Sequence, residues 1–198
     1  MPPAIEESYF RCWDFDSTDP ANILPGTLWN RRTNIAVQQC PSFEGKPFGT
    51  NDPYTGYNYN TSYIGCGLGE TTPLGKPHST PARLSSLRRS TQVALFGDAM
   101  CYRNGALVTN KFMRSPLRMT GTDIGDGLFP LARVAGTQGY RHLGRTNVCY
   151  LDGHADSVKD RYTQAGSVLA GVATYPANAV AGATTGFLSP DNRAYDGK

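Results

Sequence analysis

The segment TNVCYLDGHADSV, residues 146–158, constrains the fold more than any other part of the chain. An Asp-Gly pair lies here between two strand-like runs. Asp-Gly is a strong local signal for a β-hairpin, because a type I′ turn needs positive φ at both central residues. We therefore expect Asp152 and Gly153 to form the turn, with Asp152 accepting a backbone hydrogen bond. An antiparallel pair of strands follows from this prediction.

Two further segments predict strands. The run from Val93 to Phe96 is short and apolar and ends in Gly97-Asp98, which is typical of a buried strand. In GYNYNTSYIG, residues 56–65, polar and aromatic residues alternate, which predicts a half-buried strand with a tyrosine face. A helix is expected only from about Leu28 to Gln38, after the Pro25-Gly26 turn.

Turn-forming residues dominate the rest of the chain, which has 22 glycines and 14 prolines among 198 residues. Residues 103–139 read as a long excursion around GTDIGDGLFP, and residues from about 160 to 198 as a C-terminal wrap. No repeat or domain boundary is evident, so we expect a single loop-rich domain over residues 1–198.

Charge and hydropathy exclude two classes of partner. The formal net charge is +3, with 19 basic and 16 acidic residues, which is too balanced for a nucleic-acid-binding protein. The most apolar stretch, SVLAGVATYPANAVAGATTGF, is interrupted by Pro176 and Asn178 and does not match a membrane span. Any membrane association is therefore expected to depend on another segment.

Several polar clusters are candidate metal sites. His142, Asp152 and His154 lie close in sequence, and a metal-dependent hydrolase built on them is one hypothesis. Asp123 and Asp126, in a glycine-rich loop, are weak candidates for a structural calcium ion, although the loop lacks the EF-hand spacing. Asx-turns are the preferred explanation of such aspartates. Apart from that calcium ion, we expect no cofactor.

Tyrosines suggest a second kind of site. Tyr57, Tyr59 and Tyr63 follow one another closely, and aromatic rings on a strand are used to stack against sugars. The alternative interpretation is that these rings cover the edge of a core. A carbohydrate-binding module is therefore a competing hypothesis for the whole chain. The nucleophile and phosphate-binding motifs of common enzymes are absent from the sequence, so we expect no enzymatic activity.

His142, nine intervening residues and then Asp152-Gly153 resemble the H-X9-DG motif of proteins made with a prepilin-type N-terminal segment. These proteins are similar to type IV pilins and type II secretion pseudopilins. The segments QQCPSF, GYNYNTSYIG, ALFGDA and GFLSPDNRAYD are similar to other parts of that family's pattern, so the resemblance extends from about residue 28 to the C-terminus.

The resemblance implies an α+β pilin-like head with a small antiparallel sheet. It implies a structural role for the motif, in which His142 bonds a buried carbonyl or a turn carboxylate and so fixes the loop before the strand. Family members carry an apolar anchor helix of about 20 residues at the N-terminus. The first residues, MPPAIEESYF, have no such character, so we expect the anchor to be missing from this chain.

The function implied is that of a non-enzymatic subunit of a pseudopilus or pilus-like assembly, with other pilin or pseudopilin subunits as partners. Its location would be extracytoplasmic, in the periplasm or at the cell surface. That compartment is oxidising, so at least one pair among the five cysteines is expected to form a disulfide. The sequence does not rank the pairings.

Overall fold

A computed structural model describes the parts of the chain that build the sheet and its surroundings. The described residues are 15–16, 19, 21–22, 24–26, 40–45, 56–60, 63–64, 83–103, 106–116, 136–163 and 184–196. The expected helix from Leu28 to Gln38 lies outside these residues.

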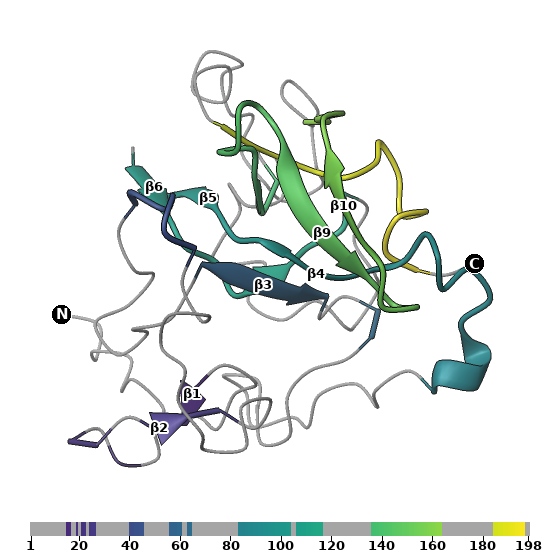
Figure 1. Ribbon diagram of the computed structural model, residues 1–198, viewed down its shortest axis with the longest axis horizontal. Coiled ribbons are helices and arrows are strands. Elements are labelled where there is room, and N and C mark those ends of the chain that lie inside the picture. The colour runs from purple at the N-terminus through teal and green to yellow at the C-terminus, as the bar shows by residue number, and fades with distance from the viewer. Residues whose placement is uncertain are drawn as a thin grey trace, which may run out of the picture.

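A five-stranded sheet organises the fold, with strand order β10-β9-β4-β3-β7 (Figure 1). Central strand β4 pairs antiparallel with β3 on one side and with β9 on the other. The outermost pair β3 and β7 is parallel. The strands are β3 (Tyr57–Asn60), β4 (Ala94–Asp98), β7 (Phe112–Met113), β9 (Thr146–Tyr150) and β10 (Ala155–Val158).

In the described part of the chain, three two-stranded antiparallel ladders and one short helix accompany this sheet. The ladders are β1 (Phe15–Asp16) with β2 (Leu24–Pro25), β5 (Cys101–Arg103) with β6 (Ala106–Val108), and β8 (Gln138–Gly139) with β11 (Thr185–Gly186). The helix is a single 3-10 turn, η2 (Leu84–Ser86). Among the described residues, no helix has the length and apolar character needed to cross a membrane.

The expected sheet is confirmed, but its strand arrangement is corrected. The described residues contain a sheet but no α-helix, and the sheet is mixed instead of antiparallel. A parallel pair needs a long crossover connection. Here β4, β5 and β6 lie between β3 and β7 in the sequence, so no local turn motif predicts the pairing. Part of the excursion predicted for residues 103–139 therefore consists of strands β6 and β7.

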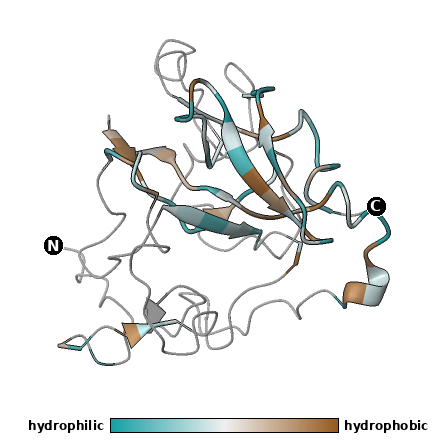
Figure 2. Ribbon diagram, viewed as in Figure 1, coloured by the Kyte–Doolittle hydropathy of each residue, from teal (hydrophilic) through white to brown (hydrophobic). Residues whose placement is uncertain are grey.

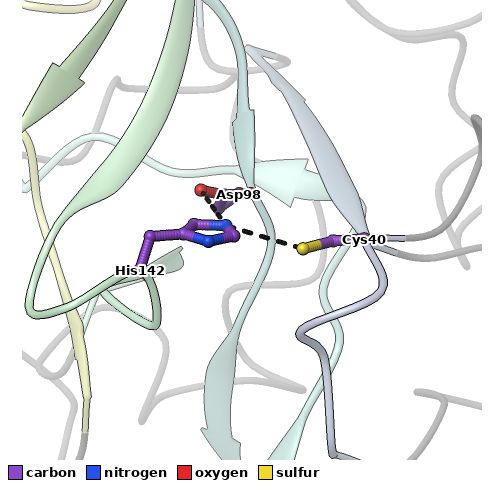
Figure 3. A group of neighbouring side chains, drawn as sticks. All are labelled: Cys40, Asp98 and His142. Carbon is purple, nitrogen blue, oxygen red and sulfur yellow. Dashed lines mark hydrogen bonds and ion pairs between the residues drawn. The ribbon is translucent and has the colours of Figure 1, made fainter.

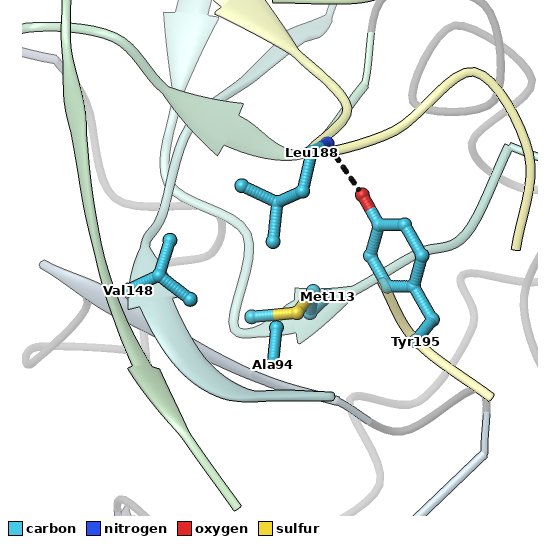
Figure 4. Packing of buried hydrophobic residues seen from close by; sticks show 5 residues of the cluster. All are labelled: Ala94, Met113, Val148, Leu188 and Tyr195. Atoms are coloured by element: carbon cyan, nitrogen blue, oxygen red, sulfur yellow. Dashed lines mark hydrogen bonds between the residues drawn. The ribbon is translucent and has the colours of Figure 1, made fainter. Parts of the chain in front are cut away.

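Two groups of buried apolar residues form the core. The larger consists of Ala94, Met113, Val148, Leu188 and Tyr195, and joins β4, β7 and β9 to the C-terminal segment (Figure 4). The Tyr195 hydroxyl accepts a hydrogen bond from the Leu188 backbone N–H at 2.8 Å, so residues 184–196 are an integral part of this core. The smaller group consists of Cys40, Phe43 and Met100, with Tyr57 and Leu107 packed against it.

Strand β3 is hydrophilic in composition although half of it is buried (Figure 2). Its alternation is confirmed, but the fully buried side chains are Asn58 and Asn60 and the tyrosines are only partly covered. Asn60 Nδ2 donates to the carbonyls of Ala94 and Tyr195, both at 2.9 Å. Asn58 Nδ2 donates to the Thr137 carbonyl at 2.7 Å. These bonds replace the water that the amides lose on burial.

Candidate functional site

The hairpin between β9 and β10 has the predicted position but a different turn. Gly153 N–H donates to the Tyr150 carbonyl at 3.0 Å, and Tyr150 N–H donates to the His154 carbonyl at 2.8 Å. Gly153 has a φ of +92°, whereas Asp152 is not among the residues with positive φ. This is a three-residue loop closed by a glycine in the left-handed region, and the predicted type I′ geometry is wrong here.

Asp152 is occupied with its own turn. One of its carboxylate oxygens, Oδ1, accepts from the His154 backbone N–H at 3.2 Å and lies 2.6 Å from His154 Nδ1. The hydrogen bond from the His154 side chain lowers the pKa of Asp152. The His154 ring also stacks on Tyr150, with 4.4 Å between ring centroids and an interplanar angle of 6°. His154 and Asp152 therefore stabilise the tip of the hairpin.

A type I′ turn does occur directly before β9. His142 and Arg145 exchange backbone hydrogen bonds, both at 3.1 Å, around Leu143 and Gly144. These two residues have φ values of +54° and +76°. Leu143 is fully exposed and is the one non-glycine residue with positive φ in the described part of the chain. The turn reverses the chain directly before β9 and presents His142 at its base.

His142 is held between two buried groups that are remote in sequence (Figure 3). Its Nε2 lies 3.2 Å from Asp98 Oδ2 at the end of β4 and 3.5 Å from Cys40 Sγ. Asp98 retains 1% of its side-chain exposure and His142 29%. A carboxylate was one of the partners expected for His142, but that carboxylate belongs to the central strand and not to the turn. The anchoring role predicted for this histidine agrees with these contacts.

Arg141 completes the cluster. Its Nε donates to Cys40 Sγ at 3.2 Å, and its Nη2 donates to Asp98 Oδ1 at 2.9 Å. The same guanidinium donates to the carbonyls of Ala99, at 2.9 Å, and Gly56, at 2.6 Å. Its charged centre also lies 5.6 Å from the centroid of the Phe43 ring. One buried cation therefore neutralises Asp98 and fixes the position of Cys40.

Local sequence explains how these side chains meet. Asp98 is the last residue of β4 and follows its apolar residues. Its side chain is therefore buried at the end of the sheet. A second donor, the Asn147 backbone N–H on β9, contacts Asp98 Oδ2 at 2.7 Å. Cys40 is 3% exposed and packs with Phe43, whose backbone N–H bonds the Cys40 carbonyl in a tight turn. Three segments therefore converge on one point.

The chemistry open to this cluster is limited by its geometry. A cysteine, a histidine and an aspartate also form the catalytic triad of some proteases, but in a triad the two ring nitrogens have different partners. Here Cys40 and Asp98 both approach the same nitrogen, Nε2. Asp98 therefore does not orient the ring for proton transfer from the thiol. Holding the loop in place, or binding an ion shared by all three groups, fits the arrangement better.

The tyrosines named as a ligand face belong to two different parts of the core. Tyr57 packs against the group of Cys40, Phe43 and Met100, and Tyr63 against the group that includes Tyr195. Burial, with Cys40 and Asp98 nearby, raises the pKa of Tyr57. The Tyr59 ring lies 5.3 Å from that of Phe96 on the neighbouring strand. Tyr57 and Tyr63 therefore pack against different parts of the core, which argues against one platform of three rings.

Asp152 and His154 meet at the tip of the hairpin, but His142 contacts Asp98 instead, so these three metal candidates do not form one site. Asp123 and Asp126 lie outside the described residues. Within the described ranges, the cluster that offers three metal ligands is Cys40, Asp98 and His142, and neither Asp152 nor His154 belongs to it. Cys40 and Cys149 carry free thiols. The expected disulfide stays a prediction, because Cys12 and Cys66 are not described.

Sequence reasoning missed Cys40 and Asp98 as partners of His142, and Arg141 as the residue that bonds both of them. A local signal existed only for Asp98, a carboxylate directly after a buried strand. Cys40 is 102 residues from His142, and no periodicity connects them. Comparisons with protein-family models, with curated proteins and with solved structures each give no match to this chain.

Proposed function

We propose that this protein is a non-enzymatic structural subunit, the head of a pseudopilus or type IV pilus-like assembly. The proposal rests on the resemblance of the H-X9-DG segment to prepilin-type proteins. Partners would be other pilin or pseudopilin subunits, and the location would be extracytoplasmic. A pilin-like fold is part of the same proposal.

One observation carries the structural role: the motif residues bond other groups of the same fold. His142 contacts the buried Asp98, Asp152 accepts hydrogen bonds within its own turn, and Gly153 supplies the positive φ that the turn needs. Residues that bind a substrate would direct their polar atoms outward into a cleft. The motif is therefore better explained as a brace for the β9–β10 hairpin than as a substrate site.

The bracing contacts also suit a subunit that must keep its shape in an assembly. Arg141, His142 and Asn147 all bond Asp98, so both ends of the turn before β9 are tied to the central strand. A hairpin fixed in this way can present a constant surface to neighbouring subunits. Rigid elements position interaction surfaces more accurately than loops do.

The test is to follow the native protein in the cells that encode it, using antibodies raised against this chain. We expect it in the membrane fraction and in material sheared from the cell surface. Mass spectrometry of its N-terminal peptide should show cleavage after a glycine and a methylated Phe or Met. Recovery only from the cytosol, with an unprocessed N-terminus, would overturn the proposal.

A further inference from the structure

Three chemically different metal ligands converge at the base of the turn before β9. They are Cys40 Sγ, an Asp98 carboxylate oxygen and His142 Nε2, and these atoms all lie within 4.8 Å of one another. Figure 3 shows the imidazole directed toward both of the other groups. Thiolate, carboxylate and neutral imidazole are the three ligand types that zinc uses in proteins.

The spacing of these atoms agrees with a tetrahedral ion. With zinc bonds of about 2.3 Å to sulfur and about 2.1 Å to nitrogen and oxygen, tetrahedral angles place sulfur and nitrogen about 3.6 Å apart. The same bonds place nitrogen and oxygen about 3.4 Å apart. The corresponding separations here are 3.5 Å for Cys40 Sγ and His142 Nε2, and 3.2 Å for His142 Nε2 and Asp98 Oδ2.

Hydrogen bonding alone explains the cluster less well. A ring nitrogen has either one proton or one lone pair, so Nε2 bonds only one of its two neighbours well. An imidazolium bonded to a carboxylate prefers about 2.7–2.9 Å, which is shorter than the contact with Asp98. An ion bound to the Nε2 lone pair would fit both of the separations measured from His142.

From this geometry we infer that Cys40, Asp98 and His142 bind one Zn²⁺ ion, with water as the fourth ligand. The inference goes beyond the proposed structural role and does not depend on it. Cys40 would lose its thiol proton to solvent when the ion binds, and the thiolate would then bond the metal. The presence of a thiolate distinguishes this site from the oxygen-only sites that calcium and magnesium use.

The surrounding groups support such a site. Arg141 Nε bonds the Cys40 sulfur and Arg141 Nη2 bonds Asp98 Oδ1, so both anionic ligands have a second partner besides His142. Asn147 N–H bonds Asp98 Oδ2. Outer contacts of this kind orient the ligands of zinc sites. Once the ion is bound, the Cys40 thiolate and the Asp98 carboxylate balance its two positive charges, and Arg141 offsets part of that negative charge.

The expected effect of the ion is to join three segments that are remote in sequence. It would link the turn at Cys40, the end of β4 and the turn before β9. Water reaches the cluster, because His142 retains 29% of its side-chain exposure. The ion would therefore exchange with chelators without unfolding of the protein, and its removal would lower the thermal midpoint.

The test uses the purified full chain, stripped with a chelator and titrated with Zn²⁺ and, as a spectroscopic probe, with Co²⁺. We expect one ion per chain and a sulfur-to-cobalt charge-transfer band. Cys40→Ser should abolish that band, and both Cys40→Ser and His142→Ala should weaken Zn²⁺ binding by more than about 100-fold. Cys149→Ser and His154→Ala are the matched controls, which should bind Zn²⁺ as the wild type does.

Two outcomes would overturn the inference. One is a folded wild-type chain that binds no Zn²⁺ at micromolar concentrations or gives no thiolate band with Co²⁺. The other is Zn²⁺ binding that survives Cys40→Ser unchanged. Should Cys40→Ser fail to fold, serine variants of the other four cysteines decide the question, because a band that every one of them retains comes from Cys40. None of these results depends on whether the protein assembles with pilins.

Discussion

Arg141 contacts more of the buried polar groups around the cluster than any single motif residue does. Its guanidinium is nearly enclosed, with 6% exposure, and it donates to two carbonyls, a carboxylate and a sulfur. A planar guanidinium with five donors suits this task, whereas a lysine ammonium does not present the same fork. Asp98, as the buried counter-charge, depends on it.

Arg141→Met should therefore destabilise the protein by about 3–5 kcal/mol, because it leaves the Asp98 carboxylate buried without its cation. The measurement is equilibrium unfolding in urea. Arg193→Met is the matched control. It also removes an Arg–Asp pair, with Asp191, but both side chains are largely solvated and the midpoint should barely move. Equal losses in the two variants would show that burial of the Arg141 pair is unimportant.

Gly153 gives a second prediction at this scale. Its φ is +92°, and beyond its chain neighbours no described atom lies within 4 Å of the position that a Cβ would occupy. A side chain here therefore meets backbone strain but no steric clash. Gly153→Val should cost about 1–2 kcal/mol of unfolding free energy. Gly153→Asn should cost much less, because asparagine adopts the left-handed region more readily. Thermal melts that do not separate the two variants would contradict the turn assignment.

At the level of elements, the two turns that flank β9 differ from what their sequences suggest. The Asp-Gly pair forms the three-residue loop, and the tighter type I′ turn uses Leu143 and Gly144. Leucine is poorly suited to positive φ, because its Cβ approaches the following carbonyl oxygen. Two backbone hydrogen bonds between His142 and Arg145 hold this turn in spite of that cost.

Leu143→Asn should therefore stabilise the protein by about 1 kcal/mol. The side chain is fully exposed, so no packing is lost. Leu84→Asn is the control: Leu84 is also exposed, but it lies in η2, outside the left-handed region. Urea unfolding of both variants separates relief of backbone strain from the removal of an exposed leucine. A gain of similar size at both positions would point to the second cause.

The strands were predictable where their signals are local. The apolar run that starts at Val93 becomes β4, and the alternation around Tyr57 becomes β3. The Asp-Gly hairpin was predictable because its two strands are adjacent in sequence, and the structure confirms it. The pairing of β3 with β7 was not predictable, since a two-residue strand has no periodicity and its partner lies far along the chain. The same holds for the site, where Cys40 and His142 meet only through the fold.

For the molecule as a whole, buried polar groups are as prominent as buried apolar ones. Asn58, Asn60 and Gln138 are fully enclosed and bond one another or backbone carbonyls. The Tyr140 hydroxyl likewise shares its proton between the carbonyls of Asp160, at 2.7 Å, and Phe187, at 2.9 Å. Such networks stabilise one arrangement as long as every donor is kept.

Alkaline pH should reveal how far the stability of the fold depends on the Tyr140 hydroxyl. Burial raises the pKa of Tyr140 above its unfolded value of about 10. The folded state therefore prefers the neutral phenol, and its contribution to stability is intact below about pH 10 and is lost as the pH rises further. Urea unfolding across that range should show a steeper loss for the wild type than for Tyr140→Phe. Identical pH slopes would mean that this phenol does not contribute.

Asn60 has a consequence for the order of folding. Its amide joins the carbonyl of Ala94 to that of Tyr195, and Ala94 N–H in turn bonds the Ala194 carbonyl. Strands β3 and β4 can pair early during synthesis. One N–H of the Asn60 amide, however, has no acceptor until the chain around Tyr195 has left the ribosome. Closure of such distant contacts is slow compared with local pairing. A nascent chain would therefore have all five strands of the central sheet by residue 158 and still leave one donor of the Asn60 amide in water until residue 195 is made.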